Sequence, residues 1–279
     1  MIPLSDNSGN RHQEKKLISI VVTVKNEAHN IKHLLESLVL QEPPVEIIII
    51  DAASTDGTQD IVRSYQKEYD FIVLNQYAAQ RGESRNRGIK LSKGEIVAFT
   101  DGDCICNPFW AREIRNSIKN TDIVGGKTIA MGYEPFQSLG RVEVYYKDQD
   151  ITWPSCNLAY KKHILEEIGG FDRRFVTAED VDMNYRAVDR GYKISHNEKM
   201  VVYHRERSTV VSFFKQAFWN GFGRKQLTVK HGSLWSSYNP TEMLEKQIGF
   251  WWITRTMVAL TGYFSYLMAH KRYKVRGSS

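Results

Sequence analysis

The chain is poor in cysteine and proline, with three Cys and seven Pro among 279 residues. The three cysteines, Cys104, Cys106 and Cys156, provide no disulfide framework, and no His or Cys pairs stand at zinc-ligand spacing. We therefore expect them to be small, semi-buried thiols in a reducing compartment.

The sequence also lacks the signatures of nucleic-acid recognition. Lys and Arg outnumber Asp and Glu by 38 to 32, which gives a formal net charge of +6 and a pI near 9.0. These basic residues are scattered, without zinc-finger spacing or an aromatic–basic motif, so we expect no nucleic-acid partner. The remaining interpretations of the positive charge are a solvated surface, an anionic substrate and an anionic membrane face.

The beginning of the chain lacks the apolar stretch of a secretory signal. Residues 1–16 are polar and predict a flexible tail. No internal repeat or low-complexity linker follows, and the length allows one large domain or a domain with an appendage. The composition shifts after Ser208, which predicts a separate C-terminal helical segment over residues 208–279.

Apolar, β-branched runs alternate with helical patterns in the first half of the chain. The runs lie at 17–24, 45–50, 71–74 and 95–99. This alternation predicts an α/β fold with a mainly parallel central sheet and helices on both faces. The polar residues that follow the strands should then meet at one edge of the sheet.

Two carboxylates, Asp101 and Asp103, stand directly after the strand expected at 95–99. Hard oxygen ligands at this spacing can hold Mg²⁺ or Mn²⁺, which takes phosphate oxygens as further ligands. The alternative is a solvated turn without a metal.

The second half is less regular. We expect a loop entering a short strand at 153–160, a short helix at 163–168, and a strand at 200–204 that ends on His204. Thr177 and Asp180 resemble a capping box at the start of another helix.

Seven motifs, in order, resemble those of the inverting nucleotide-sugar glycosyltransferases of family 2, which have the GT-A fold. The resemblance covers about residues 17–207 and implies that these residues form a GT-A catalytic domain. One departure is that Ala52 and Ala53 follow Asp51, where the family often has a second acid or a glycine. The motifs are residues 22–27, 51–58, 84–89, 101–103, Asn157, 170–172 and 178–180.

This resemblance implies a role for each matching residue. Asp180 would be the general base, and Asp103 with His204 would hold Mn²⁺ or Mg²⁺. Glu27 would contact the ribose or base, Asp51 the nucleobase, and Arg85 the base or diphosphate. The nucleotide-sugar site as a whole would comprise Thr23, Glu27, Asp51, Arg85, Asp101, Asn157 and Glu179.

Each role has a structural alternative. Glu27 and Asp51 could be loop acids satisfied by helix N-termini, and Asp180 could only cap its helix. Asn157 could only satisfy backbone groups, and His204 could be structural. Asp182 lies two residues beyond Asp180, faces away, and is expected to be structural.

The C-terminal segment is rich in apolar and aromatic residues. Residues 210–225 interleave them with Lys and Arg, which suits an interfacial helix or one packed on the catalytic domain. Residues 248–269 contain one charge, Arg255, and basic residues follow. We expect this stretch to attach the protein to a membrane, either spanning it or lying in its interface. A contact between two copies of the chain is the alternative.

The sequence thus predicts a metal-dependent inverting glycosyltransferase of the hexosyltransferase type. It would move a sugar from a UDP- or GDP-sugar to a hydroxyl or phosphate acceptor, lipid-linked, at the cytoplasmic face of the cell membrane. The alternatives are a non-catalytic membrane-associated scaffold and a sugar nucleotidyltransferase. The latter would need a glycine-rich basic loop, which residues 24–27 do not provide.

Overall fold

The computed structural model describes residues 15–132, 142–205, 209–232, 234 and 250–276. The predicted N-terminal tail therefore lies almost entirely outside the described residues.

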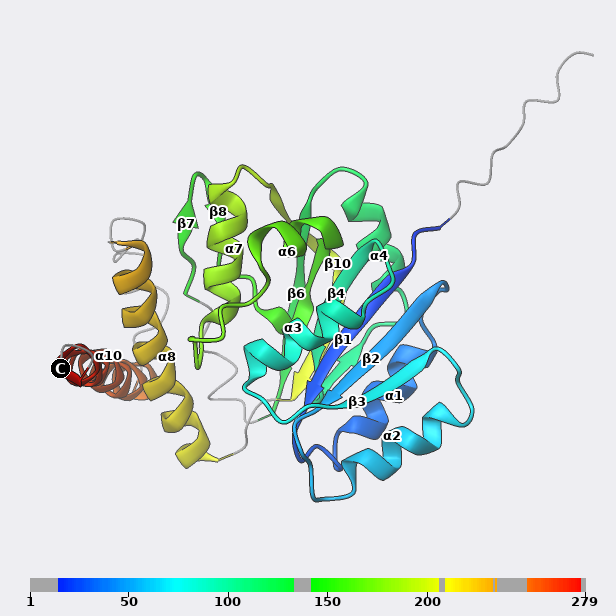
Figure 1. The fold of residues 1–279 in the computed structure, drawn as a ribbon, viewed down its shortest axis with the longest axis horizontal. Helices are drawn as coiled ribbons and strands as arrows, with labels where there is room; N and C mark the ends of the chain where they lie inside the picture. Colours follow the sequence, from blue (N-terminus) through cyan, green and yellow to red (C-terminus); the bar gives the residue numbers. More distant parts are fainter. Residues whose placement is uncertain (1–14, 133–141, 206–208, 233, 235–249, 277–279) are drawn as a thin grey trace, which may run out of the picture.

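The first half forms the predicted alternation of strands and helices. Four parallel strands stand side by side in the order β3-β2-β1-β4, and helices connect them (Figure 1). The apolar runs of β1, β2 and β4 are buried on both sides, as expected for a sheet covered by helices, whereas Val73 of the edge strand β3 is exposed. The elements are β1 (Ile18–Val24), α1 (Ile31–Val39), β2 (Val45–Asp51), α2 (Thr58–Gln66), β3 (Ile72–Gln76), α3 (Arg81–Leu91) and β4 (Ile96–Asp101).

The second half extends the sheet to eight strands. After β4 come β9 (Leu158–Lys161), β6 (Ile123–Met131), β10 (Ile194–Arg205) and, at the edge, β5 (Cys104–Cys106). β10 runs parallel to β6, whereas β9 and β5 are antiparallel to their neighbours. β7 (Tyr145–Tyr146) and β8 (Gln149–Asp150) form a separate pair.

Helices cover both faces of the sheet, as predicted. On one face α1, α2 and α4 (Trp110–Ile118) bury side chains such as Leu34, Val62 and Ile114 in one core cluster. On the other face α3, α6 (Lys162–Ile168) and α7 (Glu179–Asp189) bury Ile89, Leu165 and Met183 in a second. The sheet and its helices therefore form the predicted α/β architecture.

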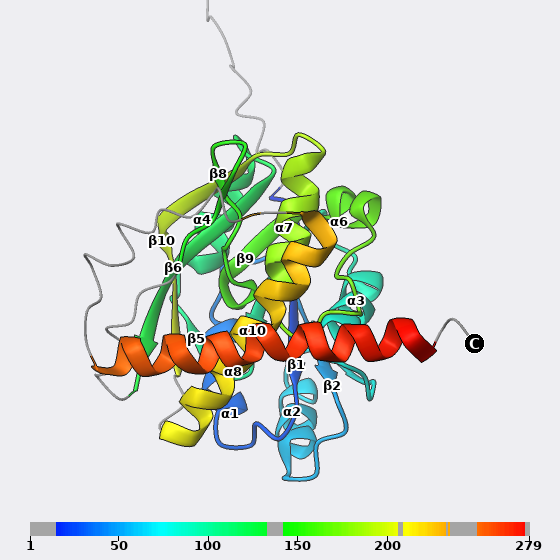
Figure 2. The same cartoon turned by 90° about the vertical axis from the view of Figure 1, so that its left-hand side faces the viewer.

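Two helices, α8 (Val210–His231) and α10 (Phe250–Arg276), lie outside this layered body and cross one another (Figures 1 and 2). Glycines allow the crossing: a Cβ on Gly221 would lie 1.8 Å from the carbonyl oxygen of Ala259, and one on Gly262 would lie 1.9 Å from that of Phe218. Among the described helices, none combines the length and the hydropathy needed to cross a membrane.

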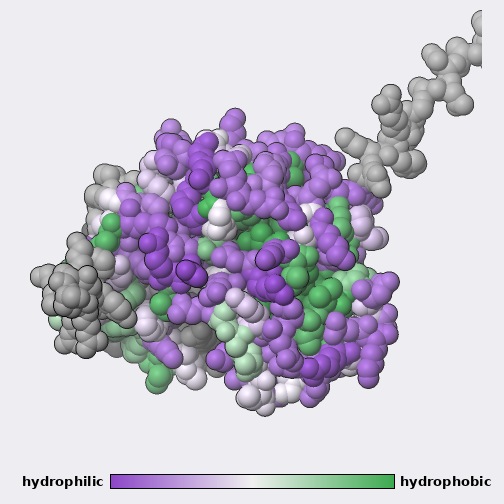
Figure 3. Space-filling view, in the orientation of Figure 1, coloured by the Kyte–Doolittle hydropathy of each residue, from purple (hydrophilic) through white to green (hydrophobic). Residues whose placement is uncertain are grey.

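The hydrophilic surface and the absence of disulfides among the three cysteines agree with the polar, cysteine-poor composition. Hydrophilic residues cover most of the described surface on the face shown in Figure 3. All three cysteines are free, as predicted, and they are buried rather than semi-buried.

Candidate active site

The parallel strands bring the predicted polar residues to one edge of the sheet. In the register of β1, Thr23 stands beside Asp101 of β4, and Val24 beside Asp51 of β2. Thr23 and Asp101 line a cleft at this edge. Asp51 is fully buried next to Ala52, which lines the same cleft.

Asp51 retains an unused hydrogen-bonding group. Its Oδ1 accepts bonds from the backbone N–H of Ser54 at 3.0 Å and from Gln59 Nε2 at 2.7 Å. Its Oδ2 has no hydrogen-bond partner among the described residues. A buried acceptor left in this state costs about 1–3 kcal/mol, so the position suits a donor group supplied by a ligand.

Glu27 lies on the loop after β1, which is hydrogen-bonded to the start of α2. The backbone N–H of Glu27 donates to Thr58 Oγ1 at 2.9 Å, and Asn30 Nδ2 donates to its carboxylate at 2.8 Å. Burial, together with the negative charges of Asp103 and Asp101, raises the pKa of Glu27. Its side chain lies against Gly102, where a Cβ would come within 2.9 Å of Glu27 Cγ.

Arg85 bridges two acids of the site, Asp101 and Glu179. Its guanidinium donates to Asp101 Oδ1 at 2.7 Å and to Glu179 Oε1 at 2.8 Å. The side chain is 1% exposed and does not line the cleft. Although burial raises the pKa of Asp101, the charges of Arg85, Arg81 and His204 together outweigh it and lower that pKa. The structure therefore corrects the predicted contact of Arg85 with the base or diphosphate: Arg85 positions the two acids.

Glu179 and Asp180 begin α7 and both line the cleft. Ala178, just before them, has a left-handed backbone (φ 61°), and no side chain caps the helix. The predicted capping box is therefore wrong. Asp180 instead accepts bonds from the backbone N–H of Ser155 at 3.1 Å and of Val181 at 2.9 Å. Its carboxylate is thereby held at the cleft wall.

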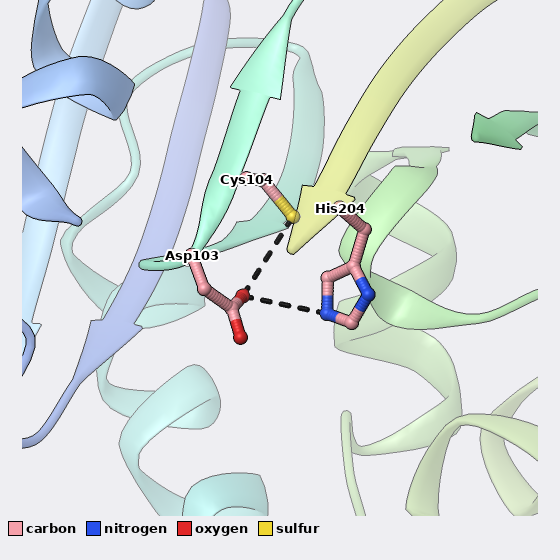
Figure 4. Close-up of side chains that lie close together, drawn as sticks. All are labelled: Asp103, Cys104 and His204. Carbon is pink, nitrogen blue, oxygen red and sulfur yellow. Dashed lines mark hydrogen bonds and ion pairs between the residues drawn. The ribbon is translucent and has the colours of Figure 1, made fainter. Parts of the chain in front are cut away.

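The pairing of β5 with β10 brings Asp103 to His204 (Figure 4). Their Oδ1 and Nε2 atoms are 3.4 Å apart, and Cys104 Sγ lies 3.9 Å from the same oxygen. Ligand atoms of all three residues lie within 4.8 Å of one another. Carboxylate and imidazole suit Mn²⁺, whereas the thiol is a softer ligand. The hydrogen bond with Cys156, together with burial, raises the pKa of Cys104 and keeps it protonated.

The surroundings of His204 favour its protonated ring. Burial favours the neutral form, but the hydrogen bond with Asp103 and the charges of Cys156, Asp103 and Asp101 raise the pKa of His204 to about 9. A metal ligand must be the neutral ring, so a bound metal would compete with this proton.

Asn157 and Asp182 have structural roles. Asn157 is fully buried, accepts from Trp110 Nε1 at 2.8 Å and donates to two backbone carbonyls at 3.0 Å. All its polar atoms are thus used within the protein, which corrects its predicted place in the nucleotide-sugar site. Asp182 is fully buried and binds Arg186, Lys230 and His231, which confirms that it is structural.

One wall of the cleft comes from the C-terminal helices and was not predicted from the sequence. Residues on one face of α8 form this wall together with Arg255 of α10. The helical spacing of the α8 residues was visible in the sequence, but not the direction in which this face points. These residues are Gln216, Trp219, Asn220, Arg224, Leu227 and Thr228.

The glycosyl transferase family 2 model matches residues 19–171, which carry most of the strand-end residues described above. The chain belongs to glycosyl transferase family 2. Membership supports glycosyl transfer as the activity.

Similar proteins in this family include archaeal enzymes. The chain is 30% identical over 206 residues to glycosyltransferase AglE of Haloferax volcanii, covering 68% of this chain and 67% of the relative. It is 26% identical over 253 residues to dolichyl N-acetyl-alpha-D-glucosaminyl phosphate 3-beta-D-2,3-diacetamido-2,3-dideoxy-beta-D-glucuronosyltransferase of Methanococcus voltae, covering 77% and 74%. For two other curated relatives, the match spans 54% of the relative's length.

The GT-A fold of this family 2 member is also found in solved structures. Mannosyltransferase PcManGT of Pyrobaculum calidifontis, in complex with GDP-Man and Mn²⁺, aligns with a TM-score of 0.63 at 18% identity. The alignment covers 93% of this chain and 76% of that one.

Proposed function

We propose that the protein is an inverting, divalent-metal-dependent glycosyltransferase that uses a UDP- or GDP-sugar. The observation that carries the proposal is that a single cleft contains Asp180 on one wall and the Asp103–His204 pair on another. A base and a site for the leaving diphosphate are the two elements that a single-displacement transfer needs.

Asp180 acts as the general base in this proposal. It takes the proton from the acceptor hydroxyl as that oxygen attacks the anomeric carbon and the nucleoside diphosphate leaves. Hydrogen bonds from Ser155 and Val181 orient the carboxylate. The ion pair of Arg85 with Glu179, the preceding residue, fixes the start of α7.

The donor is held at the strand ends. Asp51 Oδ2 accepts a hydrogen bond from the nucleobase, and Glu27 and Asp101 contact the ribose from the cleft edge. Asp103 and His204 are the residues that would hold Mn²⁺ or Mg²⁺, which supplies charge neutralisation for the leaving diphosphate. Support for this ion comes from the ligand geometry at the two residues and from the Mn²⁺ in the similar mannosyltransferase.

Membrane attachment through α10 forms the second part of the proposal. Large apolar side chains recur every three or four residues along α10 and are 36% to 68% exposed. Basic residues follow at positions 271, 272, 274 and 276. An apolar helix face beside basic residues suits the interface of an anionic membrane, with the helix lying in its plane. The exposed side chains are Ile253, Met257, Leu260, Phe264, Leu267 and Met268.

A lipid-linked acceptor at the cytoplasmic membrane face is consistent with this attachment. It is also supported by the Methanococcus voltae relative, whose name specifies a dolichyl-linked glucosaminyl phosphate.

Calorimetric titration of UDP and GDP, each with and without Mn²⁺, tests the donor site. We expect one nucleotide to bind more tightly when Mn²⁺ is present. If neither nucleotide binds, the enzymatic proposal fails and a non-catalytic scaffold becomes the better interpretation.

A further inference from the structure

The acceptor side of the cleft carries two arginines from the C-terminal helices. Arg224 of α8 and Arg255 of α10 both line the cleft that contains Asp180. In the sequence, Arg255 is an isolated charge within a long apolar stretch. In the structure, Arg255 lines the cleft together with residues of the sheet and of α7, so its charge can act on a group bound in the cleft.

The position of α8 relative to the proposed base is fixed by close packing. A Cβ on Gly223 would lie 2.6 Å from Thr177 Cγ2 and 3.2 Å from Ala178 Cβ. Gly223 therefore packs directly against the segment that leads into Asp180, and Arg224 is the next residue. An acceptor whose hydroxyl reaches Asp180 would extend along this face of α8.

A second set of contacts keeps α8 in this place. Lys230 and His231 bind the buried carboxylate of Asp182 at 2.5 and 2.7 Å, and Gln226 donates to the carbonyl oxygen of Arg174 at 2.9 Å. These contacts anchor the C-terminal end of α8 to α7.

The charged residues that the C-terminal helices contribute to the cleft lining are both arginines, Arg224 and Arg255. At the strand ends, by contrast, the carboxylates of Glu27, Asp101 and Asp103 lie among basic residues such as Lys25, Arg81 and Arg205. Guanidinium is well suited to binding phosphate through paired hydrogen bonds. Trp219, on the same face of α8, adds an apolar surface beside the two arginines.

From this arrangement we propose that Arg224 and Arg255 bind a phosphate group carried by the acceptor, with Trp219 contacting the portion next to it. The inference rests on the proposed glycosyltransferase function and specifies its acceptor class. Such a phosphate could belong to a lipid carrier or to a soluble glycan phosphate, and the experiment below separates these two sources.

The experiment first saturates the protein with Mn²⁺ and whichever of UDP or GDP binds, so that the diphosphate site is filled. Farnesyl phosphate, farnesol and glycerol 1-phosphate are then titrated separately by calorimetry. We expect farnesyl phosphate to bind more tightly than farnesol. A preference over glycerol 1-phosphate assigns a lipid-borne phosphate, and equal affinity for the two phosphates assigns a soluble one.

The variants Arg224→Gln and Arg255→Gln should each weaken farnesyl phosphate binding roughly 10- to 100-fold, as expected for loss of a charge-assisted hydrogen bond. Arg224→Lys should retain part of the affinity. Lys215→Gln removes the same charge from an exposed position on α8 outside the cleft and should have no effect. Trp219→Ala should weaken farnesyl phosphate more than glycerol 1-phosphate.

Nucleotide binding serves as the reference in every variant. If wild-type protein binds the nucleotide with Mn²⁺ but neither phosphate compound, the acceptor inference is overturned. The same holds if the Arg224→Gln/Arg255→Gln double variant binds both phosphates as tightly as the wild type. Failure of the wild type to bind either nucleotide would instead contradict the proposed function.

Discussion

Arg85 and Glu179 are joined by a hydrogen-bonded ion pair of 2.8 Å although 94 residues separate them in the chain. The same guanidinium also binds Asp101 at the end of β4. One buried side chain thereby connects the donor side of the cleft to the helix that carries the proposed base.

Replacing Arg85 with Met should destabilise the fold and weaken nucleotide binding together. Two carboxylates would lose their buried partner, and breaking a buried ion pair costs about 3–5 kcal/mol. Denaturant unfolding and nucleotide titration measure the two effects. Arg190→Met is the matched control, since the Arg190 side chain is 45% exposed and lies 3.7 Å from Glu167, which is 50% exposed. Unchanged stability of Arg85→Met would contradict the positioning role.

Asp180→Asn should leave nucleotide affinity nearly unchanged while lowering the rate of sugar transfer roughly 10²- to 10⁴-fold, the usual contribution of a general base. The amide keeps the shape of the side chain but cannot take the proton. Transfer assays with the identified donor measure the loss, and Asp189→Asn at the exposed end of the same helix serves as control. Full turnover by Asp180→Asn would rule out its role as base.

Asp103→Ala should abolish the increase in nucleotide affinity that Mn²⁺ gives. In the wild type, that increase should grow as the pH rises toward about 9, because the proton on His204 competes with the metal. Titrations at several pH values measure both effects, with Asp60→Ala, whose side chain is 83% exposed on α2, as the control. A Mn²⁺ effect that persists in Asp103→Ala would show that the ion binds elsewhere.

The contact of α8 with Asp182 should weaken in acid. Burial alone would raise the pKa of Asp182, but the hydrogen bond from His231 and the charges of Arg186 and Lys230 lower it. A carboxyl with a lowered folded-state pKa stabilises the fold above its unfolded pKa of about 3.9, and this contribution is lost as the pH falls through the lower value.

Hydrogen exchange of the α8 amides, corrected for intrinsic rates, measures this effect. Protection should fall below about pH 4 in the wild type. Asp182→Asn should already lose about 2 kcal/mol of protection at pH 7, because its hydrogen bonds no longer involve a charged acceptor. Equal α8 protection in the two proteins at pH 7 would contradict the anchoring role.

Leu260→Glu and Phe264→Glu should reduce binding to vesicles that contain anionic lipid, because each change places a charge in the exposed apolar face of α10. Vesicle sedimentation measures the bound fraction. Leu40→Glu is the control, since Leu40 is 69% exposed and belongs to the catalytic domain. An unchanged bound fraction for both α10 variants would refute attachment through this helix.

The arrangement of the first half of the protein was predicted well from the sequence, because it depends on segments that are neighbours in the chain. A strand, its terminal acid and the next helix follow one another, so Asp51 and Asp101 could be placed at the sheet edge from the pattern alone. Contacts between distant segments were harder to predict. β5 has three residues, too few for a periodic signal, and its pairing with β10 is what brings Asp103 to His204.

Burial and helix orientation account for the remaining differences. Arg85 and Asn157 carry polar groups that suit a ligand, but both are buried and bonded to protein partners, and this depends on tertiary packing. For the same reason, the side of α8 that faces the cleft could not be read from its spacing. The sequence indicated that Arg255 is a charge within a membrane-attached segment, whereas the structure places it in the lining of the cleft.

The β5–β10 pairing also bears on the order of folding. Residues 17–101 form strands that close short loops, whereas Asp103 meets His204 only after a loop of about one hundred residues has closed, a step of high contact order. During synthesis the end of the site that we propose binds the nucleobase can therefore take shape well before the proposed metal site. Acquisition of metal affinity would then mark the completion of the sheet, so a metal titration reports on folding as well as on chemistry.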